Sequence, residues 1–88
     1  MYKIRRCVQT CGACPSQWDL WTIEDRYIYI RYRWGHFTVS FDVNGELLQE
    51  WNKPNDDWHG LMSTHEMIKL TSGILDFSET DFTKEDKT

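Results

Sequence analysis

The three cysteines of the chain lie close enough in sequence to bind one metal ion. Cys7, Cys11 and Cys14 follow the spacing C-x3-C-x2-C, and thiolates are good ligands for zinc. Zinc is therefore the cofactor that the residue pattern favours, with a histidine as a fourth ligand. The histidines are scattered along the chain, at His36, His59 and His65. The simpler interpretation is that Cys7 packs in a strand while the other two cysteines are ordinary thiols in a loop.

A second candidate set consists of two tyrosines and two arginines at every second position of one segment. Tyr27, Tyr29, Arg31 and Arg33 are two positions apart, so all four side chains share one face of a strand. Tyrosine rings can stack on a base, and guanidinium groups bind phosphate through paired hydrogen bonds. His36, on the next strand, adds a hydrogen-bonding group. We predict that these residues bind an anionic ligand such as a nucleotide, or a protein partner; the alternative is a solvated or covered sheet face.

No pattern typical of an enzyme accompanies these residues. The chain has no glycine arrangement of a nucleophile elbow, no phosphate-binding loop and no dinucleotide fingerprint. We therefore expect a binding protein without catalytic activity. Two other roles stay open: a small zinc module organised by the three cysteines, and a protein–protein adaptor that uses Trp51, Trp58 and the acidic C-terminal residues.

The Tyr/Arg residues belong to the clearest structural pattern in the chain, a β-hairpin over residues 26–34 and 36–43. If the chain reverses at Trp34-Gly35, every cross-strand pair on one face is apolar, as a buried register requires. These apolar pairs are Tyr32 with Phe37, Ile30 with Val39, and Ile28 with Phe41. The other face pairs Arg33 with His36, Arg31 with Thr38, Tyr29 with Ser40, and Tyr27 with Asp42.

Further strands are predicted on both sides of this hairpin. Apolar and polar residues alternate over residues 2–8, which predicts a strand with Tyr2, Ile4 and Val8 on one face. A loop is predicted over residues 10–16 and a second strand over residues 17–23. Asn44-Gly45 is a hairpin turn signal, followed by a strand over residues 46–51. A glycine bulge at this turn would bury Leu47 and Trp51.

One helix is predicted over residues 63–72. Ser63 and Glu66 match a capping box, Met62 and Met67 match a hydrophobic staple, and Gly73 is placed for a helix C-cap. A short strand follows over residues 74–77, and residues 78–88 are acidic and expected to be a flexible tail. The predicted fold is α+β, an antiparallel β-meander of four to five strands with one short C-terminal helix, in a single domain over residues 1–77.

Charge is unevenly distributed along the 88 residues, whose formal net charge is −4. The basic residues of the first half are Lys3, Arg5, Arg6, Arg26, Arg31 and Arg33, whereas acidic residues dominate after residue 44. This balance argues against a general nucleic-acid binder but permits a local anion site. No apolar stretch reaches the ~20 residues of a membrane span and no signal peptide is evident, so no membrane association and a cytoplasmic location are expected.

Two segments of the sequence resemble small uncharacterised proteins of bacteria and their phages. They are CGACPSQW, residues 11–18, and YIRYRWG, residues 29–35, and the resemblance covers roughly the first half of the chain. It implies a cellular or phage-encoded accessory protein. Together with the residue pattern, the leading prediction is a binding protein, such as a phage-type accessory protein or inhibitor, that acts through the face carrying Tyr27, Tyr29, Arg31 and Arg33 (the Tyr/Arg face). It transfers no catalytic or binding residue.

Overall fold

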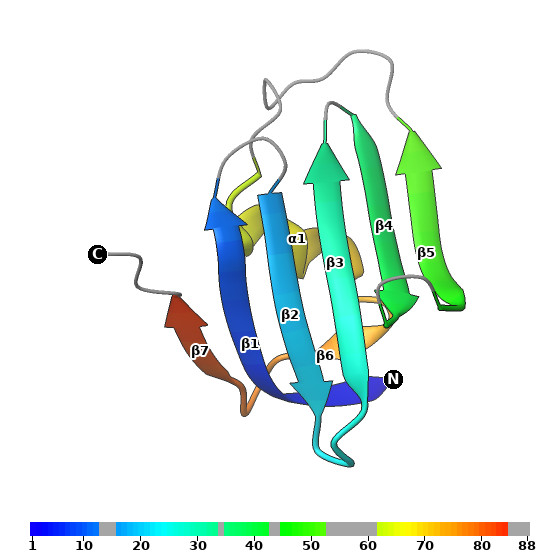
Figure 1. Cartoon of the computed structure of the whole chain (residues 1–88). Coiled ribbons are helices and arrows are strands. Elements are labelled where there is room, and N and C mark those ends of the chain that lie inside the picture. Colours follow the sequence, from blue (N-terminus) through cyan, green and yellow to red (C-terminus); the bar gives the residue numbers. More distant parts are fainter. Residues whose placement is uncertain (13–15, 34, 43–44, 53–61, 85–88) are drawn as a thin grey trace.

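A curled, seven-stranded sheet with one helix packed on it forms the fold (Figure 1). The computed structural model describes residues 1–12, 16–33, 35–42, 45–52 and 62–84. The strand order is β5-β4-β3-β2-β1-β6, and β7 also pairs with β1. The elements are β1 Tyr2–Gly12, β2 Ser16–Thr22, β3 Tyr27–Arg33, β4 His36–Phe41, β5 Leu47–Asn52, α1 Thr64–Thr71, β6 Leu75–Asp76 and β7 Asp81–Lys84.

The β3–β4 hairpin has the predicted register. All six predicted pairs between residues 28–33 and 36–41 are Cα partners, and the backbone N–H of Asp42 donates to the oxygen of Tyr27 at 3.4 Å. Burial alternates along β3, as a sheet with one covered face requires. The hairpin therefore has the two unlike faces that its sequence predicts.

The hydrophobic core lies between the sheet and α1. Strands β2, β3 and β4 direct alternate apolar side chains toward the helix, which Figure 1 shows behind the sheet. Met62 and Met67, the predicted staple pair, are both buried here. Helix α1 covers only one face, and no other described element covers the opposite face of β2, β3 and β4. The core residues are Ile4, Cys7, Trp18, Leu20, Ile28, Ile30, Tyr32, Phe37, Val39, Phe41, Met62, Met67 and Leu75.

The bulge in β5 differs from the predicted one. The register shifts between the pairs Val39–Gln49 and Ser40–Leu47, so the extra residue lies inside the strand rather than at the glycine turn. Trp51 packs against the core as predicted, but Leu47 is 52% exposed and Leu48 packs inward in its place. The prediction for Leu47 was wrong because the parity changes one residue after it.

Strand β1 is longer and less regular than predicted. It runs to Gly12, and β2 begins at Ser16, so most of the predicted loop over residues 10–16 belongs to strands. A register shift against β2 between residues 4 and 6 reverses the alternation. Cys7 is consequently buried, while Val8 is only half-buried. Tyr2, which lies before the shift at the start of the strand, is 38% exposed.

Helix α1 begins as predicted and ends differently. The Ser63 side chain caps its N-terminus, accepting a hydrogen bond from the backbone N–H of Glu66 at 3.1 Å. At the other end the C-cap residue is Ser72, whose backbone has the right-handed helical conformation. Gly73 follows without a positive φ, so it does not form the predicted glycine C-cap.

The sheet has more strands than the predicted meander of four to five, and the C-terminal part of the chain differs from the predicted flexible tail. Strands β6 and β7 both pair with β1 in parallel, which makes the sheet mixed. Between them, the Thr80 hydroxyl donates to the backbone oxygen of Ile4 at 2.6 Å. Residues 81–84 therefore form an edge strand, and residues 85–88 lie outside the described part. In the described chain, no helix has the length and apolar character needed to cross a membrane.

Candidate functional site

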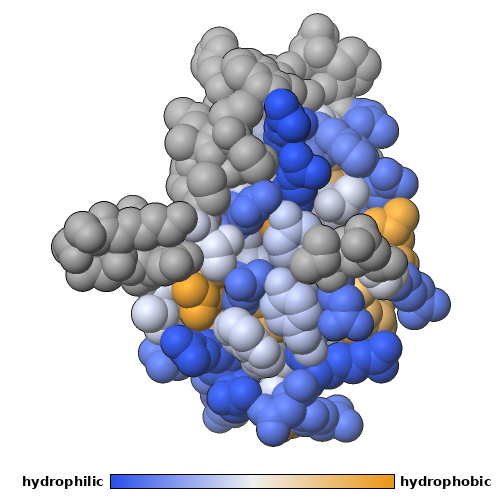
Figure 2. All heavy atoms as spheres, in the orientation of Figure 1, coloured by the Kyte–Doolittle hydropathy of each residue, from blue (hydrophilic) through white to orange (hydrophobic). Residues whose placement is uncertain are grey.

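The open face of the sheet carries a pocket over β3, β4 and the start of β5. Figure 2, which views this face, shows mainly hydrophilic and neutral residues. The pocket has a volume of about 560 Å³. Four of the five predicted ligand-binding residues line it, namely Tyr29, Arg31, Arg33 and His36. The remaining lining residues are Thr38, Ser40, Gly45 and Leu47.

The hairpin register brings the two polar rows of this pocket together. Arg33 pairs with His36, Arg31 with Thr38, and Tyr29 with Ser40. The turn between the rows contains Gly35 at a φ of 88°, a conformation that favours glycine. The backbone N–H of Gly35 donates to the hydroxyl of Tyr32 at 3.0 Å. Because Tyr32 is itself in the core, the turn is tied to the buried face.

Gly45 and Leu47 form a wall of the pocket that the sequence analysis did not assign. A Cβ at Gly45 would lie 1.7 Å from the backbone oxygen of Phe41, so only glycine fits here. The backbone N–H of Phe41 donates to the oxygen of Glu46 at 2.9 Å and closes the same turn. The Asn44-Gly45 turn signal in the sequence could have indicated that this turn lies next to the pocket. Residues 43–44 themselves lie outside the described part.

Arg31 and Arg33 differ from the other described arginines in their surroundings. Arg5 pairs with Asp25 at 2.6 Å, Arg6 lies 5.6 Å from the ring centre of Trp21, and Arg26 lies 3.5 Å from that of Phe41. Within the described ranges, no carboxylate forms an ion pair with Arg31 or Arg33. The Nε of Arg31 is buried and has no hydrogen-bond partner there. The pocket thus contains two guanidinium groups that have no carboxylate partner among the described residues.

One carboxylate does lie at the edge of the pocket. Glu50 on β5 is opposite Thr38, and its Oε2 is 2.7 Å from Nε2 of His36. Both side chains of this pair are about half exposed. Glu50 thus contacts His36, and it forms no ion pair with Arg31 or Arg33.

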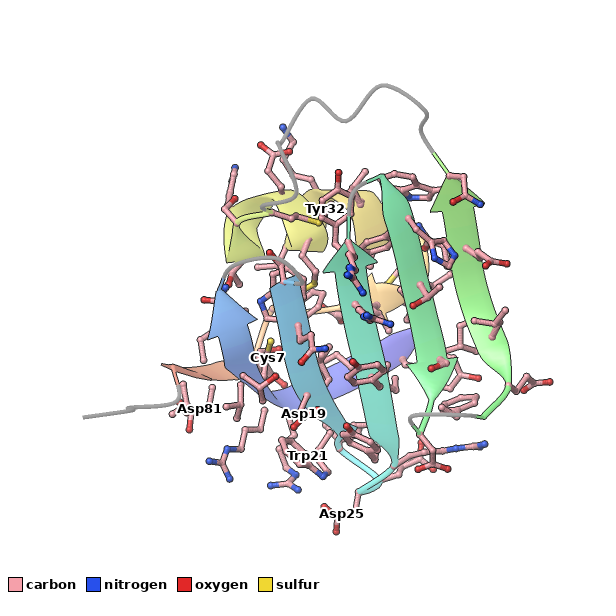
Figure 3. The ribbon with its side chains drawn as sticks, turned by 45° about the horizontal axis from the view of Figure 1, so that its top comes forward. Cys7, Asp19, Trp21, Asp25, Tyr32 and Asp81 are labelled. Atoms are coloured by element: carbon pink, nitrogen blue, oxygen red, sulfur yellow. The ribbon has the colours of Figure 1, made fainter. Side chains whose placement is uncertain are left out.

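Tyr27, the fifth predicted residue, does not line this pocket. Its hydroxyl donates to Oδ1 of Asp19 at 2.5 Å, and its ring lies 5.7 Å from that of Trp21. Figure 3 shows Asp19 and Trp21 on β2. Burial and the hydrogen bond to Asp19 raise the pKa of the Tyr27 phenol, so this hydroxyl stays protonated at neutral pH. Tyr27 therefore belongs to an aromatic cluster beside the pocket.

The structure describes only part of the predicted zinc site. Cys7 is buried, and burial, followed by the charge of Asp19, raises the pKa of its thiol to about 12. Cys14 and the side chain of Cys11 lie outside the described part. Among the described side chains, no three metal-ligating residues come together. Zinc binding through the three cysteines stays a prediction, and metal analysis of the purified protein would test it.

The predicted adaptor surface is likewise only partly described. Trp51 stacks on Phe37 with ring centres 5.2 Å apart and packs against the core. Its ring is therefore largely engaged within the fold. Trp58 and the last four residues lie outside the described part.

Comparisons of the chain with protein-family models, with curated proteins and with solved structures found no match. The resemblance to small bacterial and phage proteins therefore stays a prediction. The candidate function rests on the geometry of the pocket.

Proposed function

We propose that the protein is a non-enzymatic binding protein that holds an anionic ligand in the pocket formed by Tyr29, Arg31, Arg33 and His36. The observation that carries the proposal is that Arg31 and Arg33 line one pocket and have no carboxylate partner among the described residues. A guanidinium group binds phosphate or carboxylate oxygens through two parallel hydrogen bonds. Two such groups on one strand face favour an oxyanion between or above them.

The hydrogen-bonding state of Arg31 supports the same conclusion. Its buried Nε has no partner in the described chain, and an unsatisfied buried donor costs roughly 1–3 kcal/mol. A bound oxyanion that accepts from this guanidinium would recover part of that free energy. Thr38, directly opposite Arg31, adds a hydroxyl to the same pocket.

The size and charge of the pocket favour a compact ligand. A volume of about 560 Å³ lies within the ~300–1,000 Å³ of typical small-molecule sites. Tyr29 offers an aromatic wall for a planar group. The Glu50 carboxylate at the edge and the net charge of −4 oppose a long polyanion. A nucleotide, with its phosphates at the arginines and its base toward Tyr29, meets these conditions.

Thermal denaturation with three matched ligands tests the proposal. ADP and pyrophosphate should raise the melting temperature at low salt, whereas adenosine, which lacks phosphate, should not. At a ligand concentration of about 100 Kd the stabilisation is ~2.7 kcal/mol, which corresponds to roughly 10 °C or more for a domain of this size. Equal stabilisation by adenosine, or none by either phosphate compound, would contradict the proposal.

A further inference from the structure

A second pocket, of about 370 Å³, lies on the opposite side of the sheet from the pocket that Arg31 and Arg33 line, which is called the arginine pocket below. Its lining residues belong to β1, β2, α1 and β7, and Figure 1 shows β7 at the edge of the sheet beside β1. Its lining residues are Cys7, Gln9, Trp18, Thr64, His65, Ile68, Phe82 and Thr83. None of them lines the arginine pocket, so the two sites are independent.

The inner walls of this second pocket are apolar and uncharged. Trp18, Cys7 and Ile68 supply an indole, a thiol and an aliphatic side chain. The Cys7 thiol, labelled in Figure 3, is neutral at physiological pH because burial raises its pKa to about 12. The indole N–H of Trp18 already donates to Oγ1 of Thr64 at 2.9 Å. These inner walls therefore carry no charge, and their indole donor is already paired.

The outer wall of the pocket is formed by an aromatic ring that the fold leaves exposed. Phe82 on β7 is 45% exposed, and its ring stacks on that of Phe77 at 5.9 Å. The stacking holds the ring at the pocket, and covering it would remove apolar surface from water. Hydrogen-bonding groups occur at the less buried positions, from Gln9, His65 and Thr83.

We propose that this pocket is a second binding site, which takes a small uncharged molecule with a flat apolar body and one polar group. The apolar body would lie against Trp18, Ile68 and Phe82, and the polar group would face the rim. The volume equals that of roughly 12 water molecules at ~30 Å³ each, which leaves room for a body of one or two fused rings. A charged ligand would have to lose its hydration against uncharged walls, at a large cost.

Titration with two probes of the same ring system tests this site. The probes are 2-naphthol, which is uncharged at neutral pH, and 2-naphthalenesulfonate, which is an anion. We expect 2-naphthol to bind and to shift the NMR signal of the Trp18 indole N–H. The signal of Trp21, which lies on the other face of the sheet, should stay in place. Failure of 2-naphthol to bind, a shift of Trp21 alone, or equal binding of the sulfonate would overturn the proposal.

Three variants complete the test. Ile68→Trp should fill the pocket and Phe82→Ala should remove its outer wall, each weakening 2-naphthol binding by about tenfold or more. Ile23→Ala is the control. It removes an apolar side chain that is 58% exposed, and Ile23 lines neither pocket, so this variant should bind 2-naphthol like the wild type. Wild-type affinity in a folded Phe82→Ala variant would refute the site even if Ile68→Trp does not fold.

Discussion

Replacing Gly45 with alanine is expected to destabilise the protein and to distort the arginine pocket. The added Cβ would lie 1.7 Å from the backbone oxygen of Phe41 and 2.8 Å from its backbone carbon. Real Cβ atoms essentially never approach within 3.0 Å of a heavy atom outside their own residue and its chain neighbours. Since the obstructing atoms are backbone, no side-chain rotation relieves the clash. The β4–β5 turn must move by more than an ångström.

The size of the effect follows from the contacts in this turn. Overpacking of this kind costs roughly 1–3 kcal/mol. The movement also breaks the hydrogen bond from the backbone N–H of Phe41 to Glu46, which adds about 1 kcal/mol. The free energy of unfolding should therefore fall by about 2–4 kcal/mol. For a domain of this size, that corresponds to a melting temperature lower by roughly 10–25 °C.

The assay is urea and thermal denaturation followed by tryptophan fluorescence, with Gly73→Ala as the matched control. A Cβ at Gly73 meets nothing within 4 Å, and its backbone does not have a positive φ. The control should consequently stay within about 1 kcal/mol of the wild type. If Gly45→Ala were as stable as Gly73→Ala, the described geometry of the β4–β5 turn would be refuted.

Three further predictions concern the helix and the core. Ser63→Ala removes the cap that accepts from Glu66 and should cost about 1 kcal/mol in urea denaturation; a neutral result would contradict the cap. Thr64→Val removes the acceptor of the Trp18 indole N–H and should lower the free energy of unfolding by roughly 1–3 kcal/mol. An unchanged free energy of unfolding would contradict a stabilising role of that hydrogen bond. The folded pKa of Cys7 is raised from 9.0 to about 12, so its burial stabilises the fold below pH 9.0 and this contribution is lost as the pH rises toward 12. Cys7→Ala should abolish this part of the alkaline destabilisation, and an unchanged pH profile would contradict it.

The hairpin could be predicted from the sequence because its register depends on local information. Ile28, Ile30 and Tyr32 alternate with polar residues, and their partners on β4 alternate in the same phase. A shift of one residue would bury arginines, so a single register satisfies both faces. The placement of Tyr29, Arg31, Arg33 and His36 around one pocket follows directly from that register.

The edges of the sheet could not be predicted in the same way. The sequence of β7 shows little apolar alternation, and its large apolar residue, Phe82, is exposed. The position of β7 depends instead on backbone pairing with β1. Such pairing with a distant strand leaves no periodic signal in the sequence. The shifts that bury Cys7 and expose Leu47 are also set by strand pairing. Pocket walls that depend on them, such as Leu47 and Phe82, were therefore missed.

Calorimetric titration of ADP into two double variants tests anion binding at the arginine pocket most directly. Arg31→Ala/Arg33→Ala removes both guanidinium groups of the pocket, whereas Arg5→Ala/Arg6→Ala makes the same change of net charge outside it. A hydrogen bond to a charged group contributes roughly 1.5–3 kcal/mol.

We therefore predict that the first double variant binds ADP at least about 100-fold more weakly than the wild type and that the second binds within a few-fold. Equal losses in the two variants would show that binding follows net charge alone. Unchanged affinity in Arg31→Ala/Arg33→Ala, or no binding of ADP to the wild type, would contradict the proposed site.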